Sequence, residues 1–213
     1  METKPLAIDN HLLSIMERLK RETKTQHTQI EHLHTMKRLF ADDYTLTEYR
    51  WHLEKMYGYL SVIEPLLLQH LQEEALQNFF LKRCKKSWLI QDLSHFGLSE
   101  EQILTLPHCP VPNYINNLSE ALGVYYVLEG SSLGGQFIFK RLNQNFGEVV
   151  KNKLHFYQGY GEQTYFKWQQ FSELLETHFA HETQAEITQM VTAAKLTFNS
   201  LAQWLTSKMG DKA

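Results

Sequence analysis

The chain has 213 residues, 43% of them hydrophobic, and a formal net charge of −3, which is typical of one globular domain with a sizeable core. This charge gives no basic field for nucleic acid, and the longest apolar runs are too short to span a membrane. Residues 1–9 lack the apolar segment of a signal peptide. Cys84 and Cys109 have neither metal-knuckle nor redox spacing, so we expect a reducing, cytoplasmic compartment.

The first predicted helix runs from about Asn10 to Glu31 or His34. Its apolar and small residues recur at helical spacing, and they are Leu12, Leu13, Met16, Leu19, Thr23, His27 and Ile30. His27 therefore falls where a core-facing residue is expected, and Lys20 lies two turns earlier on nearly the same face. A single histidine in such a stripe is more often a core residue than a ligand, and both interpretations stay open at this point.

The middle of the chain predicts three further helices. A capping box at Thr45–Glu48 starts one that Pro65 should kink or end, and another pattern covers about Glu74 to Ser94. The basic run at residues 82–86 is interpreted as a solvated face, with a docking patch for an acidic partner as the alternative. A short helix starts at Ser99, and a rigid proline-containing loop follows at residues 107–112.

The long helical pattern at residues 117–142 contains Gly130, Gly134 and Gly135. Each glycine in a helix costs about 1 kcal/mol relative to alanine. Gly130 and Gly134 are four residues apart, so they lie on the same face, where a flat ligand could approach the backbone. Close packing of a neighbouring helix explains the same spacing equally well.

The remaining chain predicts a turn at residues 159–161 and two helices, at about residues 162–178 and 182–209. No segment shows the alternation of a strand. We therefore predict an all-α fold of seven to nine helices in a single domain over residues 1–213, with residues 1–9 and 210–213 flexible.

Two kinds of active site are disfavoured by spacing. Glu31 and His34 form one E-x-x-H, but a di-iron bundle needs two such motifs and two more glutamates. Neither cysteine has a setting that would activate it as a nucleophile. The interpretation that remains is a porphyrin between His27 and the glycine strip. Its carboxylates could then be bound by Lys20, Tyr125 and Lys167.

Two segments carry a resemblance to a known family. Residues 19–31, Leu-Lys-Arg-Glu-Thr-Lys-Thr-Gln-His-Thr-Gln-Ile-Glu, resemble the proximal-helix motif of heme oxygenases, and residues 125–136 resemble their distal-helix signature. The Gly159–Gly161 turn and the helix start at residues 166–168 are also similar to that family. The resemblance covers about residues 12–178, and its Leu-Glu-Gly-Ser-x-Leu-Gly-Gly form is similar to the bacterial branch that supplies biliverdin to bacteriophytochromes.

The resemblance implies a heme held between a proximal helix and a kinked distal helix. His27 would be the iron ligand, and Gly130 and Gly134 would bring the distal backbone close to the heme, with Gly135 serving helix geometry. The residues that match propionate-binding positions of the family are Lys20, Tyr125 and Lys167.

Two positions depart from the family pattern. Ser131 stands where many members have an aspartate that orders the distal water, so Ser131 or Ser132 hydroxyls and backbone groups would have to organise that water. Phe171 stands where an arginine often follows the propionate-binding lysine, which leaves the position of ring opening unassigned.

The implied reaction is the oxidative opening of heme to biliverdin, carbon monoxide and ferrous iron, with heme as both substrate and oxygen-activating cofactor. Electrons would come from a ferredoxin, a flavodoxin or a reductase, guided by basic residues near the heme edge, namely Lys20, Lys24, Lys140 and Arg141. A bacteriophytochrome would be a possible acceptor of the biliverdin. The alternatives are a non-catalytic heme-binding or heme-sensing protein, and a non-heme relative such as a thiaminase-like or di-iron enzyme.

Overall fold

The computed structural model describes residues 13–179 and 181–208, and these residues form helices, turns and loops without any strand. The predicted flexible ends, the predicted helix start at Asn10 and the predicted helix end at Met209 lie outside the described residues. The α-helices are α1 (Ile15–Glu22), α2 (Lys24–Glu31), α3 (His34–Arg38), α4 (Leu46–Gln69), α5 (Glu74–Leu81), α6 (Lys86–His95), α7 (Glu100–Leu104), α8 (Leu118–Phe146), α9 (His155–Gln158), α10 (Thr164–His178) and α11 (Gln184–Thr206).

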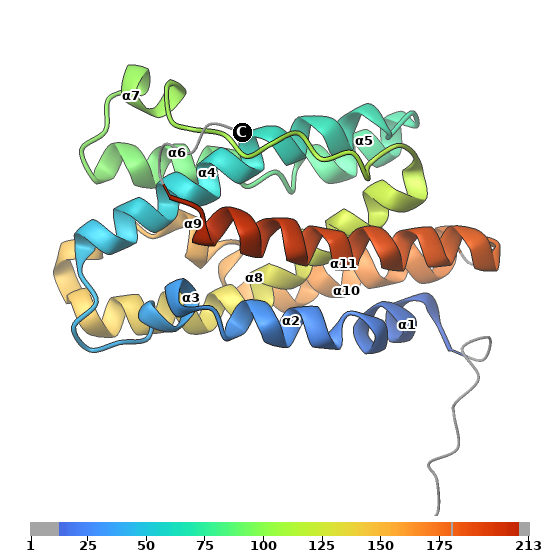
Figure 1. Ribbon diagram of the computed structural model, residues 1–213, viewed down its shortest axis with the longest axis horizontal. Coiled ribbons are helices and arrows are strands. Elements are labelled where there is room, and N and C mark those ends of the chain that lie inside the picture. Colours follow the sequence, from blue (N-terminus) through green and yellow to red (C-terminus); the bar gives the residue numbers. More distant parts are fainter. Residues whose placement is uncertain (1–12, 180, 209–213) are drawn as a thin grey trace, which may run out of the picture.

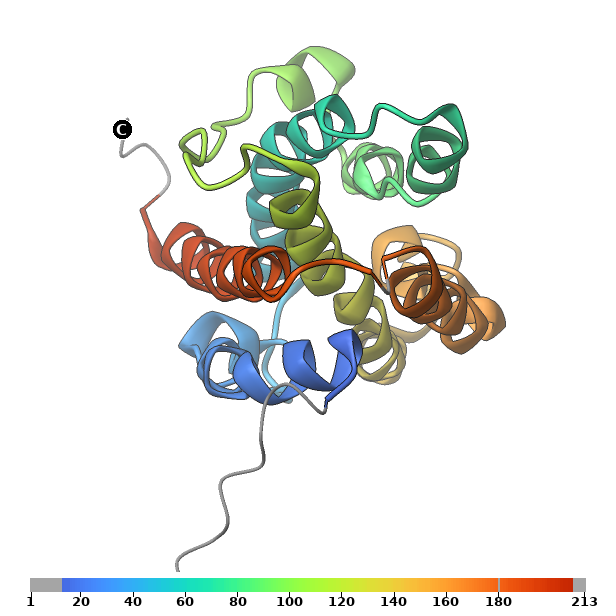
Figure 2. The ribbon, with the colours of Figure 1, turned by 90° about the vertical axis from the view of Figure 1, so that its right-hand side faces the viewer.

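The helices are arranged around α8, which runs through the middle of the molecule (Figure 2). Helices α4 to α7 lie on one side of α8, and α1 to α3 lie on the opposite side, with α10 and α11 flanking it (Figures 1 and 2). Helix α11 packs along α8 and also contacts α1, α2 and α4. The all-α expectation is confirmed, and no helix in the described part of the chain is long and apolar enough to cross a lipid bilayer.

The helix starts follow local sequence signals. The capping box predicted at Thr45–Glu48 is present, since the Thr45 hydroxyl accepts from the Glu48 amide and the Glu48 carboxylate accepts from the Thr45 amide. The predicted start at Ser99 is also a capping box, with Gln102 as its partner. Pro65, in contrast, does not end α4, which continues to Gln69. Leu67 and Leu71 beyond it are fully buried, and this burial offsets the hydrogen bond that the proline removes.

The first predicted helix is interrupted at Thr23, which separates α1 from α2. The buried Thr23 hydroxyl donates to the Leu19 carbonyl oxygen at 2.6 Å. The backbone amides of Thr23 and His27 keep their helical bonds to the Leu19 and Thr23 carbonyl oxygens, at 3.0 Å and 2.9 Å. Thr23 and Ile30 are both buried at positions of the predicted stripe, so the stripe of α1 continues into α2.

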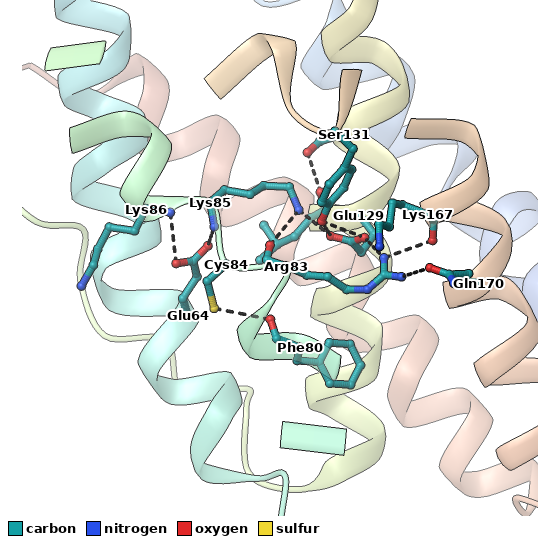
Figure 3. Close-up of polar contacts among 12 residues, drawn as sticks. Glu64, Phe80, Arg83, Cys84, Lys85, Lys86, Glu129, Ser131, Lys167 and Gln170 are labelled. Atoms are coloured by element: carbon teal, nitrogen blue, oxygen red, sulfur yellow. Dashed lines mark hydrogen bonds and ion pairs between the residues drawn. The ribbon is translucent and has the colours of Figure 1, made fainter. Parts of the chain in front are cut away.

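The basic run at residues 82–86 is not a solvated face, which corrects the sequence interpretation. The predicted helix over residues 74–94 is broken there into α5 and α6, and Arg83 and Lys85 turn inward until each is 4% exposed. Both cations bind the buried carboxylate of Glu129 on α8, each at 2.5 Å (Figure 3). A run of basic residues in the sequence does not show that a carboxylate from a distant helix is buried beside it.

Further contacts make this charged cluster a junction of three segments. The Tyr160 hydroxyl donates to Glu129 at 2.9 Å, and the Arg83 guanidinium donates to the Lys167 carbonyl at 3.0 Å and to Gln170 at 3.2 Å (Figure 3). Burial raises the pKa of Glu129, but the nearby Lys85 and Arg83 charges and the Tyr160 hydroxyl outweigh it and hold that pKa below its ordinary value. Glu129 is therefore ionised at neutral pH.

A second buried carboxylate holds the start of α6. Glu64 on α4 accepts from the backbone amides of Lys85, at 2.5 Å, and of Lys86, at 3.3 Å (Figure 3). These amides belong to the first turn of α6 and have no partner inside that helix. The turn that carries Arg83 and Lys85 is thus fixed on both sides before it reaches Glu129.

Replacing the Glu129 carboxylate by an amide should destabilise the fold strongly. Glu129→Gln leaves two buried cations without a counter-charge, and breaking a buried pair in this way costs about 3–5 kcal/mol. Because the pKa of Glu129 is lowered in the folded state, this stabilisation is complete at pH 7 and is lost as the pH falls below the ordinary carboxyl range. Urea unfolding at pH 7 measures the change in free energy.

The matched control is Glu148→Gln, which removes a carboxylate from an exposed pair with Lys151. A surface pair of this kind contributes at most about 1 kcal/mol. An equal loss of unfolding free energy in Glu129→Gln and Glu148→Gln would contradict the stabilising role assigned to the charged cluster.

Candidate functional site

His27 lies on α2 with its side chain 57% exposed, so it is not the core residue that the apolar stripe predicts. Ile30, three residues later on nearly the same face, is buried, so the exposure of His27 does not come from a change of helix face. The imidazole is fixed from two sides. Its edge meets the Phe198 ring of α11 at 5.6 Å between centroids, and its Nδ1 lies 3.5 Å from the Glu31 carboxylate one turn later.

The glycine strip, Gly130 and Gly134, belongs to an uninterrupted part of α8. Gly134 is exposed, and a Cβ built there would have no atom within 4 Å. A Cβ at Gly130 would meet only the indole of Trp168, at 3.5 Å. Packing of a neighbouring helix therefore does not explain Gly134. It does explain Gly135, which is buried against Tyr157 of α9 and faces away from the strip.

Thr23 and Tyr126 place α2 and α8 relative to each other. The Tyr126 hydroxyl lies close to the Thr23 side chain, which lowers the pKa of Tyr126 against the larger raising effect of burial. Figure 1 shows α2 and α8 running in the same direction. His27 follows Thr23 by four residues and Gly130 follows Tyr126 by four, so each lies one turn beyond the contact on parallel helices.

The polar groups beside the strip are already engaged. Ser131 is exposed, and its hydroxyl donates to the Leu128 carbonyl of its own helix at 2.7 Å. Its oxygen can still accept a hydrogen bond from water. Glu129, the nearest acid in sequence, cannot take the place of the family aspartate, because both its oxygens are buried and bound by Arg83, Lys85 and Tyr160.

The three expected propionate-binding residues differ in their exposure. Lys20 is exposed on α1, whereas Lys167 is half-buried on α10 and lines a cavity of about 320 Å³ with Phe79, Lys82 and Gln170. Tyr125 is 2% exposed, stacks on the Phe80 ring at 3.8 Å and has no hydrogen-bond partner among the described residues. This placement in the core corrects the expectation that its phenol reaches a ligand edge.

Phe171 occupies the position of the family arginine and is fully buried. Its ring packs against Phe80, at 6.3 Å between centroids, and against Trp168, at 5.9 Å. An arginine in this place would put its charge into the apolar core, so the local packing on α10 is built around the phenyl ring.

Sequence reasoning missed several residues around the strip. Tyr126 precedes Gly130 by one turn and Glu31 follows His27 by one turn, so i, i+4 spacing alone could have suggested both. Phe137, which is 72% exposed three residues after Gly134, adds an apolar side chain beside the strip. Trp168 and Phe198 come from distant helices, and no local signal identifies them.

Comparison with known proteins adds three solved structures of similar fold. A heme oxygenase from Leptospira interrogans matches with a TM-score of 0.71 at 18% identity, covering 91% of this chain and 99% of that one. Heme oxygenase-1 from the cyanobacterium Synechocystis sp. PCC6803, solved in complex with heme, matches with a TM-score of 0.69 at 15% identity, covering 91% of both chains. A domain of unknown function with a heme oxygenase-like fold from Shewanella denitrificans matches with a TM-score of 0.70 at 13% identity, again covering 91% of both chains.

No curated protein sequence matches the chain. The sequence model of the heme oxygenase family, in contrast, matches residues 13–207, which include α1 to α11. The matched range contains both the helix of His27 and the helix of the glycine strip. The chain therefore belongs to the heme oxygenase family.

Proposed function

We propose that this protein is a heme oxygenase that opens heme to biliverdin, carbon monoxide and ferrous iron, using O₂ and external electrons. One observation carries the proposal: an exposed histidine on α2 stands one turn beyond the Thr23–Tyr126 contact, at the same level as an uncovered glycine strip on α8. Membership of the family and the fold of the heme complex from Synechocystis support the same assignment.

The residues present fit a heme by their chemistry. The ligand is flat and mostly apolar, so it needs a bare backbone on one face, an imidazole on the other and apolar rings beside it. The open space at Gly134 leaves the backbone bare, and His27 provides the imidazole. Trp168 and the exposed Phe137 provide the apolar rings. When bound, heme would supply iron for oxygen activation and the macrocycle that is opened.

His27 would hold the iron through Nε2. Its Nδ1 faces the Glu31 carboxylate at 3.5 Å, and this contact favours the tautomer that keeps the proton on Nδ1. The lone pair of Nε2 is then free for a metal. Phe198 keeps the ring plane in place from the α11 side, so the imidazole needs little reorganisation to act as a ligand.

The distal side would act through backbone and serine rather than through a carboxylate. Gly130 and Gly134 leave room for the ligand and for water close to the helix backbone. The Ser131 hydroxyl donates its hydrogen bond to the Leu128 carbonyl. The Ser131 oxygen would then accept a hydrogen bond from a water molecule and orient that water. Glu129 contributes only by fixing α8 from behind, as both of its oxygens are occupied.

Electrons would come from a separate protein, such as a ferredoxin, a flavodoxin or a reductase. Lys20, Lys24 and Lys140 are exposed and available to guide an acidic donor. Arg141 is less available because it pairs with Asp42. A bacteriophytochrome is our proposal for the acceptor of biliverdin, and cytoplasmic placement belongs to the same proposal.

One observation favours a second candidate, a non-catalytic heme-binding protein on the same fold. Ser131 stands in place of the acid, and its hydroxyl is bound to its own helix. Hemin binding without pigment formation in the presence of reductant and O₂ would select this alternative. Formation of biliverdin would exclude it.

His27→Ala should separate ligation from burial. Hemin should still bind through its apolar surface, but the histidine-ligated absorption spectrum should disappear and turnover should fall at least tenfold, by about 1.4 kcal/mol or more. Added imidazole should restore part of both. The matched control is His32→Ala, an exposed histidine at the end of the same helix. Unchanged spectrum and turnover in His27→Ala would reject this ligand.

Gly134→Ala should stabilise the protein without heme and weaken heme binding. A methyl group there meets no atom, and alanine improves helix stability by up to about 1 kcal/mol. The matched control is Gly123→Ala on the same helix, whose Cβ would lie 2.0 Å from the Met190 carbonyl of α11 and should destabilise the fold. Urea unfolding and hemin titration measure the two effects. Native hemin affinity in Gly134→Ala and in the bulkier Gly134→Leu would mean that the strip does not face the heme.

Lys20→Ala and Lys167→Ala should each alter the ratio of biliverdin isomers while changing hemin affinity only modestly. Two in-plane orientations of heme that differ by about 1.4 kcal/mol are populated tenfold differently, and loss of one cation can remove that difference. Lys82→Ala is the control, because Lys82 is exposed and lines the same cavity as Lys167. Chromatography of the extracted pigment gives the ratio. A ratio unmoved in both variants would assign the propionates to other groups.

A further inference from the structure

A second group of metal-binding side chains lies on the other side of α8 from the glycine strip. Asp92 and His95 are three residues apart on α6, so they share one face of that helix. His155 is the first residue of α9, which packs against α6. Among the described residues, these three form a set whose possible ligand atoms all lie within 4.8 Å of one another.

The Asp92 carboxylate is fully buried and is aimed by three donors. Its Oδ1 accepts from the backbone amide of His155 at 2.7 Å and lies 2.8 Å from His155 Nδ1. Its Oδ2 accepts from the Phe156 amide at 2.9 Å. The backbone bonds fix the carboxylate, and the side chain that faces it is an imidazole rather than a lysine or arginine.

The two imidazoles lie side by side. The rings of His95 and His155 are 5.4 Å apart between centroids and 16° from parallel. His95 is exposed and can change rotamer, and 29% of the His155 side chain is exposed. An ion could therefore reach the three side chains from solvent.

The spacing suits a transition-metal ion. Adjacent ligands on an ion with bonds of about 2.1 Å lie about 3 Å apart, and opposite ligands about 4.2 Å apart. The 2.8 Å between Asp92 Oδ1 and His155 Nδ1 already matches adjacent ligands. In the tetrahedral geometry that Zn²⁺ prefers, ligand atoms lie about 3.4 Å apart, so His95 has to close by up to about 1.4 Å from the 4.8 Å limit, which a rotamer change of this exposed side chain supplies.

We propose that Asp92, His95 and His155 form a binding site for a divalent transition-metal ion of the Zn²⁺ and Fe²⁺ class. Two imidazoles and one carboxylate are the donor set that such ions prefer over Mg²⁺ or Ca²⁺. The ion takes the place of the proton between Asp92 and His155, and His155 then carries its proton on Nε2. Solvent fills the remaining coordination positions, so the affinity is moderate and the ion exchanges.

The site reaches the back of the distal helix through a short series of contacts. Tyr157, two residues after His155, packs against Gly135 on the face of α8 opposite the strip. Its hydroxyl is hydrogen-bonded to the buried His52 of α4. An ion on His155 therefore tightens α6, α9 and α8 against one another, and binding should raise the thermal stability of the protein.

The test is Zn²⁺ titration of the heme-free protein, with any affinity tag removed, by calorimetry, together with Co²⁺ titration followed by visible absorption. We expect one site. His95→Ala and His155→Ala should each weaken Zn²⁺ binding at least tenfold. Asp92→Asn should weaken it as well, but its single amide oxygen can accept from only one of the two α9 amides, so this variant also loses stability and the two histidine variants carry the test. Zn²⁺ should raise the melting temperature of the wild type and not of these variants.

Histidines elsewhere serve as controls, and the outcome is independent of heme chemistry. His27→Ala and His32→Ala should bind Zn²⁺ like the wild type, and hemin turnover does not enter the measurement. Wild-type Zn²⁺ affinity in His95→Ala and His155→Ala would overturn the proposal, as would the absence of saturable binding. Loss of binding in His27→Ala instead would place the ion at the proximal histidine.

Discussion

The position of α8 depends on one buried interaction, the Glu129 carboxylate with Arg83 and Lys85. Successive residues of a helix are about 100° apart, so a side chain held on one side sets where its neighbours point. Glu129 is drawn toward the turn between α5 and α6 (Figure 3). Gly130 and Gly134, one and five residues later, therefore face another side of α8. If α8 were rotated about its axis, Glu129 would move away from Arg83 and Lys85, and these charges would lose their partners. The cluster thus determines which face of α8 is bare.

The glycines inside the long helices α4 and α8 divide into two groups by what a side chain would meet. Gly58 and Gly123 allow close approach, because a Cβ at either would come within 2.2 Å of a carbonyl oxygen of Pro107 or Met190. Gly134 has no such neighbour and sits in a helix that alanine would strengthen. A residue that lowers helix stability without relieving any contact is best explained by a ligand that needs the space. The same comparison assigns Gly135 to packing, against Tyr157.

Local patterns predict the elements better than they predict burial. The capping boxes at Thr45 and Ser99 and the long glycine-containing helix follow from neighbours in sequence, and the structure has them. The apolar stripe of the first helix does not reveal the exposure of His27, since Thr23 and Ile30 on the same stripe are buried. The burial of Arg83 and Lys85 depends on Glu129, 44 to 46 residues away, so a reading of the basic run alone places both cations in solvent. The burial of Tyr125 could not be predicted for a similar reason, since its ring stacks on Phe80, which comes from the distant helix α5.

The central claim is that a heme lies between His27 on α2 and the glycine strip on α8. Crystals of the hemin complex, measured at the iron absorption edge, locate the iron without any assumption about the protein. The account predicts one strong iron position within bonding distance of His27 Nε2, with the porphyrin face against Gly130 and Gly134. An iron bound by a different histidine, or a porphyrin lying on another surface of the molecule, would contradict it.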